Sequence, residues 1–133
     1  MVVVDNDVIS YFWLESARSG SARKVRRQDG MWAAPFLWRN EFRSVLAQHM
    51  HVKGLPYNQA LRFVQMAERD MQGREYSVPA AEVLKLAGQT GHSAYDCEYV
   101  ALAQMLGVPL VTGDKQLPAI FPGTAILLED FTS

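Results

Sequence analysis

Short apolar runs alternate along the chain with longer segments in which apolar residues recur every three or four positions. The first run, Val2–Val4, is β-branched throughout and predicts a strand buried on both faces. Strands are also expected at residues 31–35, 74–78, 108–111 and 125–128. This alternation is typical of a parallel sheet covered by helices. We therefore expect an α/β fold, a three-layer α/β/α sandwich with a short central parallel sheet.

The segments with a period of three to four residues predict the helices. Asn6 or Asp7 is available as the N-cap of the first helix, which Gly20 and Ser21 are expected to end. Ser93 can cap a later helix. The expected helices cover residues 8–18, 22–27, 37–52, 57–71, 79–89, 93–107 and 115–120.

Composition narrows the class of protein without identifying a function. A chain of 133 residues, 49% hydrophobic and 20% charged, fits one globular domain, so we expect a single domain over residues 1–133. Its apolar runs are too short to span a bilayer, and Asp5 interrupts the N-terminal run, so we expect a cytoplasmic protein without a membrane partner. The single cysteine, Cys97, excludes an intramolecular disulfide and a thiolate zinc cage.

Four acidic residues stand out by their position. Asp5 and Asp114 each follow an apolar strand, so both are expected at the carboxyl edge of the sheet, where such folds bind ligands. Glu41 and Asp96 lie on the apolar faces of two predicted helices. Buried carboxylates are costly unless they are paired or bind a metal, and the sequence offers no obvious basic partner for each of the four.

A hard divalent cation would satisfy the four carboxylates together. Oxygen ligands without histidine or thiolate favour Mg²⁺ or Mn²⁺ as the cofactor. The chemistry that this site implies is metal-assisted attack of water on a phosphodiester. Each acid also has a simpler explanation, namely a helix cap for Asp5, a solvated helix position for Glu41, the helix dipole for Asp96 and a turn for Asp114. The joint pattern is harder to explain in these ways than any single residue.

The acids lie in motifs that resemble a known family. The N-terminal strand with its acid, followed by Trp38–Phe42, Ser93–Ala103 and Pro109–Asp114, resembles PIN-domain ribonucleases, and more narrowly the VapC-like toxins of bacterial toxin–antitoxin pairs. The similarity covers nearly the whole chain. It implies a compact α/β/α fold with an acidic pocket that binds magnesium or manganese. It also implies endonucleolytic cleavage of RNA, control by a cognate antitoxin protein, and a homodimer.

The resemblance assigns roles residue by residue. The family's metal-binding and catalytic acids fall on Asp5, Glu41, Asp96 and Asp114. Its hydroxyl before the last acid falls on Thr112, and Asn6, beside the first acid, is a further accessory candidate. Asp7 stands where such toxins commonly have a small polar residue, and we interpret it as a helix cap rather than as part of the pocket.

Several basic residues are candidates for contacting RNA phosphates. An exposed helix face is the simpler interpretation of those between positions 23 and 27, whereas Arg39 and Lys115 lie close enough in sequence to pocket acids to pair with them. The three histidines, His49, His51 and His92, lack a convincing metal-ligand arrangement and receive no role. The candidates for RNA contact are Arg23, Lys24, Arg26, Arg27, Arg39 and Lys115.

Two other functions remain open at this point. Val4–Val8 resembles the strand-borne Asp-x-Asp motif of haloacid-dehalogenase-type phosphatases, in which Asp5 is the nucleophile and Asp7 its partner. That interpretation leaves Glu41 and Asp96 unexplained. The other alternative is a non-catalytic binding module, which keeps the fold and uses its surface for a protein partner.

Overall fold

The N-terminal strand lies at the centre of the sheet. The strands are β1 (Val2–Val4), β2 (Trp32–Pro35), β3 (Glu75–Tyr76), β4 (Leu110–Thr112) and β5 (Ala125–Leu127). In the computed structural model, which describes residues 1–133, they form one parallel sheet in the order β3-β2-β1-β4-β5. Val3 pairs with Ala33 of β2 on one side and with Leu110 of β4 on the other. This sheet confirms the α/β fold class.

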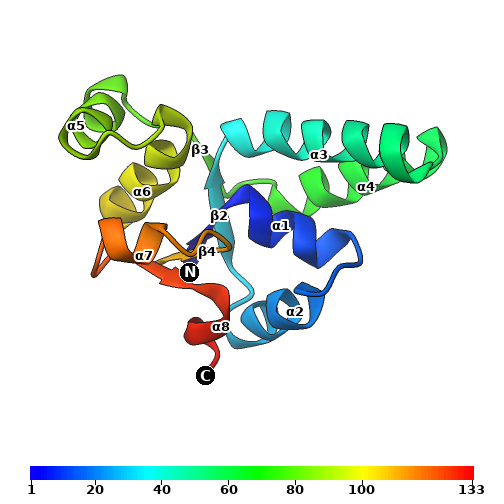
Figure 1. Ribbon diagram of the computed structural model, residues 1–133, viewed down its shortest axis with the longest axis horizontal. Helices are drawn as coiled ribbons and strands as arrows, with labels where there is room; N and C mark the ends of the chain where they lie inside the picture. Colours follow the sequence, from blue (N-terminus) through cyan, green and yellow to red (C-terminus); the bar gives the residue numbers. More distant parts are fainter.

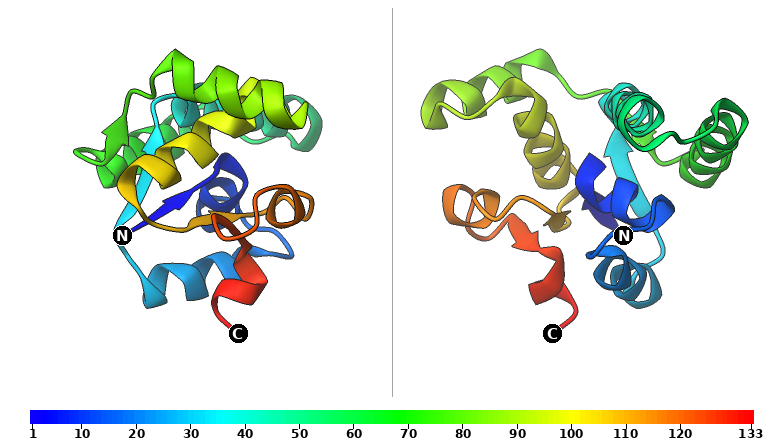
Figure 2. Two further views of the ribbon diagram at one scale, coloured as in Figure 1. Left: turned by 90° about the vertical axis from the view of Figure 1, so that its left-hand side faces the viewer. Right: turned by 45° about the vertical axis from the view of Figure 1, so that its right-hand side comes forward.

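Helices cover both faces of the sheet. α5 and α6 lie on one side, whereas α1, α3 and α4 lie on the other, so the chain forms three layers (Figures 1 and 2). α2 packs beside α8 at the lower end of the view in Figure 1. The helices are α1 (Asn6–Trp13), α2 (Ser19–Gln28), α3 (Leu37–Lys53), α4 (Tyr57–Met71), α5 (Ala80–Thr90), α6 (Ala94–Leu106), α7 (Leu117–Ile120) and α8 (Leu128–Phe131).

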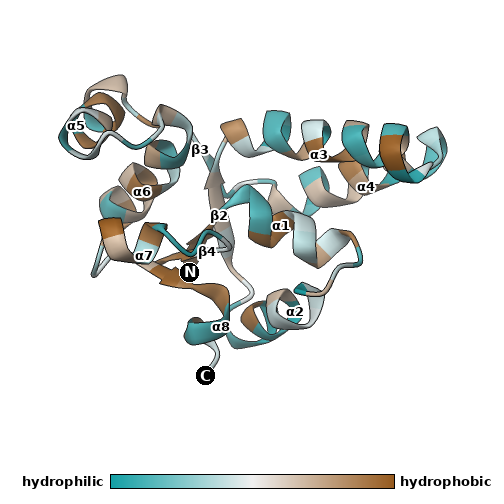
Figure 3. Cartoon of the chain, in the orientation of Figure 1, coloured by the Kyte–Doolittle hydropathy of each residue, from teal (hydrophilic) through white to brown (hydrophobic).

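The core follows from the apolar runs. All three residues of β1 are buried, as expected for a strand with neighbours on both edges and helices on both faces. Trp38 and Phe42 of α3 pack into the core from one face, and Tyr99 of α6 packs from the other. Figure 3 shows β5 in brown, and it shows helices such as α3 with hydrophobic and hydrophilic bands in alternation, as expected for helices that have one face toward the core. None of the helices combines the length and the apolar character that a membrane crossing requires.

The first helical region differs from the prediction. α1 ends at Trp13, and Gly20 and Ser21 lie inside α2 instead of ending α1. The buried hydroxyl of Ser19 explains the difference, because it donates to the carbonyl of Leu14 at 3.0 Å and accepts from the amide of Ser16 at 2.8 Å. These bonds close a turn between the two helices. The helix α8 at the C-terminal end was not predicted.

The cap of α1 is also a correction. The prediction placed Asn6 or Asp7 at this position and gave a cap only as the simpler explanation of Asp5. The N-cap is Asp5, whose carboxylate accepts a hydrogen bond from the amide of Val8 at 3.1 Å. Asp5 therefore serves the helix and the edge of the sheet at once. Asp7 lies in the first turn of α1 and makes no capping hydrogen bond. Its carboxylate is free to face another part of the molecule.

Candidate functional site

A cleft opens where the chain changes direction across the sheet. From β1 the chain runs to β2 and β3 on one side, and it then returns to β4 on the other side of β1. In open parallel sheets, ligands bind at such a switch point, beyond the carboxyl ends of the two strands. Asp5 follows β1 and Asp114 lies just beyond β4. A cleft of about 70 Å³ is lined there by Asp5, Asn6, Asp7, Glu41, Asp96, Tyr99 and Asp114.

Asp5 is the most deeply buried of these acids, with 6% of its surface exposed. One carboxylate oxygen accepts from the hydroxyl of Thr112 at 2.5 Å and from the amide of Gly113 at 3.2 Å. Burial, followed by repulsion from the charge of Asp7, raises the pKa of Asp5 to about 7, although the hydrogen bonds oppose this rise. The protein therefore holds this carboxylate firmly in place while disfavouring its charge.

Glu41 reaches the cleft from α3. Its carboxylate accepts a hydrogen bond from the hydroxyl of Tyr99 at 2.6 Å, which joins α3 to α6 across the carboxyl edge of the sheet. Burial raises the pKa of Glu41, and the charges of Asp96 and Asp7 raise it further, whereas the bond from Tyr99 lowers it. Tyr99 is buried, so its pKa is raised well above the usual value of 10.0. Its hydroxyl therefore stays protonated and acts as a donor to Glu41.

Asp96 and Asp114 lie close to His92, a histidine to which the sequence assigns no role. Ser93 caps α6, as predicted, and Asp96 lies in the first turn of that helix. The Nε2 atom of His92 lies 2.9 Å from Oδ2 of Asp96. One ligand atom from each of His92, Asp96 and Asp114 lies within 4.8 Å of the others. Such a group has the ligand types and the spacing to hold a metal ion.

Asp7 lines the cleft, contrary to its interpretation as a helix cap. Its side chain lies at the rim, where partial desolvation raises its pKa and the charges of Asp114 and Asp96 raise it further. The nearby guanidinium of Arg18 opposes the shift. No hydrogen bond to the Asp7 carboxylate is present. Asp7 therefore adds a fifth carboxylate to the four that the sequence predicted for this place.

Six basic residues were predicted to contact RNA, and none of them lines the cleft. Arg39 pairs with Glu75 at 2.6 Å and with Glu68 at 3.0 Å, and not with the pocket acids as the sequence suggested. Arg26 pairs with Asp70 and stacks over Trp32. Both arginines are therefore engaged in holding helices together. The exposed members of the set are Arg23, Lys24, Arg27 and Lys115.

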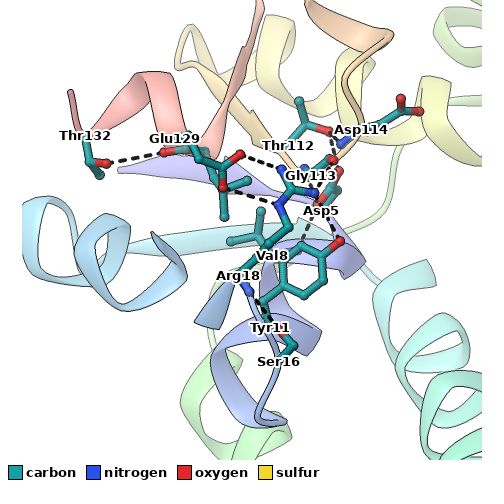
Figure 4. A network of polar contacts seen from close by, with 11 residues as sticks. Asp5, Val8, Tyr11, Ser16, Arg18, Thr112, Gly113, Asp114, Glu129 and Thr132 are labelled. Carbon is teal, nitrogen blue, oxygen red and sulfur yellow. Dashed lines mark hydrogen bonds and ion pairs between the residues drawn. The ribbon is translucent and has the colours of Figure 1, made fainter. Parts of the chain in front are cut away.

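One arginine outside that set does not line the cleft either, but it contacts the turn that carries Asp114. Arg18 follows α1 and donates to the carbonyl of Gly113 at 2.8 Å and to the hydroxyl of Tyr11 at 3.3 Å. Its other side pairs with Glu129 of α8 at 2.6 Å. Figure 4 shows these contacts beside the bond from Thr112 to Asp5. The turn that carries Asp114 is thereby connected to α1 and to α8.

Taken together, the cleft holds an excess of negative charge. Burial and mutual repulsion raise the pKa values of Asp5, Asp7 and Glu41. Arg18, whose charge lowers the pKa of Asp7, is already paired with Glu129. Carboxylates that repel one another in this way are stabilised by a bound cation, and the donor set of oxygens with one imidazole suits a divalent metal ion. The residues present therefore fit a metal site.

The chain shares its fold with solved structures, although its sequence matches no family model. No protein-family model matches it, and no curated protein matches it by sequence. The crystal structure of PAE2754 from Pyrobaculum aerophilum has a TM-score of 0.77 at 23% identity, covering 98% of this chain and 92% of that one. A toxin–antitoxin complex from Klebsiella pneumoniae has a TM-score of 0.72 at 17% identity, covering 96% of this chain and 98% of that one. At such identities the similarity shows the fold.

Proposed function

We propose that the protein is a metal-dependent endoribonuclease that hydrolyses RNA phosphodiester bonds and acts as the toxin of a toxin–antitoxin pair. The observation that carries the proposal is the gathering of five carboxylates in one small cleft at the switch point of the sheet. A binding module has no need of so much uncompensated charge. A hydrolytic metal site needs this charge, because the carboxylates bind the metal ion and the ion in turn binds the substrate phosphate.

Asp5, Glu41, Asp96 and Asp114 are the residues that would hold Mg²⁺ or Mn²⁺. When bound, such an ion supplies a water nucleophile of lowered pKa and stabilises charge on the phosphodiester. Thr112 orients Asp5 through its hydroxyl and accepts from the amide of Asp114 at 2.9 Å. Tyr99 orients Glu41 in the same way. The hydrogen bonds from Thr112 and Tyr99 therefore hold the two carboxylates in position before substrate binds.

The proposal extends to partners and place of action. The fold is shared with a chain of a toxin–antitoxin complex, which supports an antitoxin protein as the partner. The family resemblance further implies a homodimer. Chain length favours a single domain over residues 1–133, and composition favours a cytoplasmic site of action. Among the basic residues, Arg23, Lys24, Arg27 and Lys115 have exposed side chains and are the better candidates for RNA contact. Arg26 and Arg39 serve the fold.

The geometry of Asp5 weighs against the phosphatase alternative. A nucleophilic carboxylate must present an oxygen to the phosphorus atom. Both oxygens of Asp5 already accept hydrogen bonds, from Val8 on one side and from Thr112 and Gly113 on the other. These hydrogen bonds hold Asp5 in one orientation, and the phosphatase alternative leaves Glu41 and Asp96, which line the same cleft, without a role.

The test is RNA cleavage by purified protein with Mn²⁺, with Mg²⁺ and with chelator. Asp5→Asn and Asp96→Asn should abolish cleavage, and chelator should do the same, because each removes the metal site. Glu82→Gln is the matched control, since Glu82 is an exposed acid on α5 away from the cleft. Equal cleavage by wild type and both Asn variants would refute the proposal. A fluoroberyllate adduct on Asp5, which mimics an aspartyl phosphate, would favour the phosphatase.

A further inference from the structure

We propose that Arg18 is a positioning residue, which fixes the turn Thr112–Asp114 and so holds Asp5 and Asp114 in the arrangement of the cleft. The consequence for metal binding rests on the proposed function. The positioning itself does not, because it follows from contacts within the protein. The sequence gives no sign of this role, since Arg18 and Gly113 are 95 positions apart.

The guanidinium of Arg18 bridges three parts of the chain (Figure 4). Its Nη1 atom donates to the carbonyl of Gly113 at 2.8 Å and to the hydroxyl of Tyr11 at 3.3 Å. Its Nε and Nη2 atoms donate to the two oxygens of Glu129 at 3.3 and 2.6 Å. The guanidinium carbon lies 5.1 Å from the centre of the Tyr11 ring. The fork is thus oriented by Glu129 and aimed at Gly113.

The peptide bond between Gly113 and Asp114 is held at both ends. Arg18 donates to the carbonyl oxygen of Gly113, and the amide of Asp114 donates to the hydroxyl of Thr112 at 2.9 Å. The same hydroxyl donates to Asp5, and the amide of Gly113 also donates to Asp5. A change in this peptide plane would therefore disturb Asp5 and Asp114 together, because hydrogen bonds in such a chain reinforce one another.

The turn also lies tightly against α1. A Cβ atom on Gly113 would lie 2.7 Å from Cβ of Asp7 and 3.0 Å from the Tyr11 ring. The close contact allows little movement toward α1, and the bond from Arg18 opposes movement of the Gly113 carbonyl away from the guanidinium. Lysine cannot replace this arrangement, since a single ammonium lacks the planar fork that reaches Glu129 and Gly113 together.

The first test measures amide hydrogen exchange by NMR in the metal-free protein, with Arg18→Met, Arg18→Lys and the control Arg62→Met. Arg62 is exposed on α4, away from the cleft. Both Arg18 variants should exchange the amides of Gly113 and Asp114 about tenfold faster relative to the amide of Val4. A general loss of stability would speed all three amides alike, and that result, or unchanged exchange, would overturn the proposal.

The second test measures Mn²⁺ binding by calorimetry with the same variants. Arg18→Met should bind about tenfold more weakly, as expected when a residue that orients ligands is lost. A purely electrostatic role predicts the opposite, since removing a cation beside the acids strengthens their attraction for the metal. Rescue by Arg18→Lys would likewise show that charge suffices and overturn the proposal. Failure of wild type to bind Mn²⁺ would refute the proposed function, and hydrogen exchange would still decide the role of Arg18.

Discussion

Asp7 carries a charge that nothing in the structure neutralises by hydrogen bonding, so its removal should stabilise the metal-free protein. Its pKa is raised in the folded state, so the folded protein binds the proton more tightly than the unfolded chain. The associated stability is present below about pH 4 and is lost as the pH rises through the raised pKa. At pH 8, Asp7→Asn should therefore raise Tm, by about 1–3 °C because the side chain is accessible to solvent.

The comparison of pH values provides the control. At pH 3 the carboxyl group is neutral in both states, so wild type and Asp7→Asn should differ little in Tm. Saturating Mn²⁺ should also reduce the difference at pH 8, since the ion relieves the repulsion in wild type. A variant that is less stable than wild type at pH 8, measured by thermal unfolding without metal, would contradict this account of Asp7.

Thr112 is the fully buried hydroxyl that connects two of the acids. Thr112→Val keeps the shape but leaves Asp5 and the amide of Asp114 without that partner. Unfolding in urea should show a loss of about 1–3 kcal/mol, the usual effect of leaving buried polar groups unsatisfied. Thr112→Ser, which keeps the hydroxyl, should retain Mn²⁺ binding. If Val and Ser variants bound Mn²⁺ equally well, the hydroxyl would have no part in orienting Asp5.

Single residues were predictable where a local signal marks them. Asp5 and Asp114 could be placed at the edge of the sheet because each follows an apolar run. His92 precedes Asp96 by four positions, but it lies outside α6, so helical spacing gave no reason to join the two. Arg18 could not be found from sequence, because its partners Gly113 and Glu129 are distant in the chain.

At the scale of elements, two glycines should respond to substitution in opposite ways. Gly113→Ala forces a Cβ against Asp7 and must push the turn and α1 apart, which should cost about 1–3 kcal/mol. Gly88 lies within α5, and a Cβ there meets no atom within 4 Å, so Gly88→Ala should stabilise by about 0.5–1 kcal/mol. Urea unfolding of both variants tests the pair. A stabilising Gly113→Ala would show that α1 and the turn pack less tightly than described.

Elements with strong periodicity were predicted well. The helix at Tyr57–Met71 agrees with α4, and the cap Ser93 and the end at Gly107 agree with α6. The prediction failed between α1 and α2, where the hydroxyl of Ser19 closes a turn. Gly20 and Ser21, which are typical of loops, fit the first turn of α2 because tertiary contacts outweigh their low helix propensity.

At the scale of the whole molecule, a bound ion should stabilise the fold, because the folded chain gathers ligands that the unfolded chain scatters. Mn²⁺ at a hundred times its Kd should raise Tm by roughly 5–10 °C. Asp96→Asn should reduce the shift strongly, whereas Glu82→Gln should leave it unchanged. Thermal unfolding with increasing Mn²⁺ measures the effect. No shift at millimolar Mn²⁺ would mean that the cleft does not bind this metal.

The fold class was predictable because alternating strands and helices have few arrangements, and the observed parallel sheet confirms it. Asp5 and Asp114 lie in the same cleft because β1 and β4 are neighbours in the sheet. No local sequence pattern predicts that strand order. The tethering of the Asp114 turn to α8 through Arg18 and Glu129 likewise exists only in three dimensions.

The central position of β1 has a consequence for the chain as it is made. One neighbour of β1, β2, ends at Pro35, whereas its neighbour on the other edge, β4, begins only at Leu110. Contacts between such distant positions form late in folding, since a long loop must close first. A growing chain on the ribosome therefore contains Asp5 long before it contains Asp114 and the residues Thr112 and Gly113, which hold Asp5 in place. The cleft is completed only when nearly all of these residues have emerged, so on the proposed function a nascent chain lacks the complete site for cleaving the RNA that encodes it.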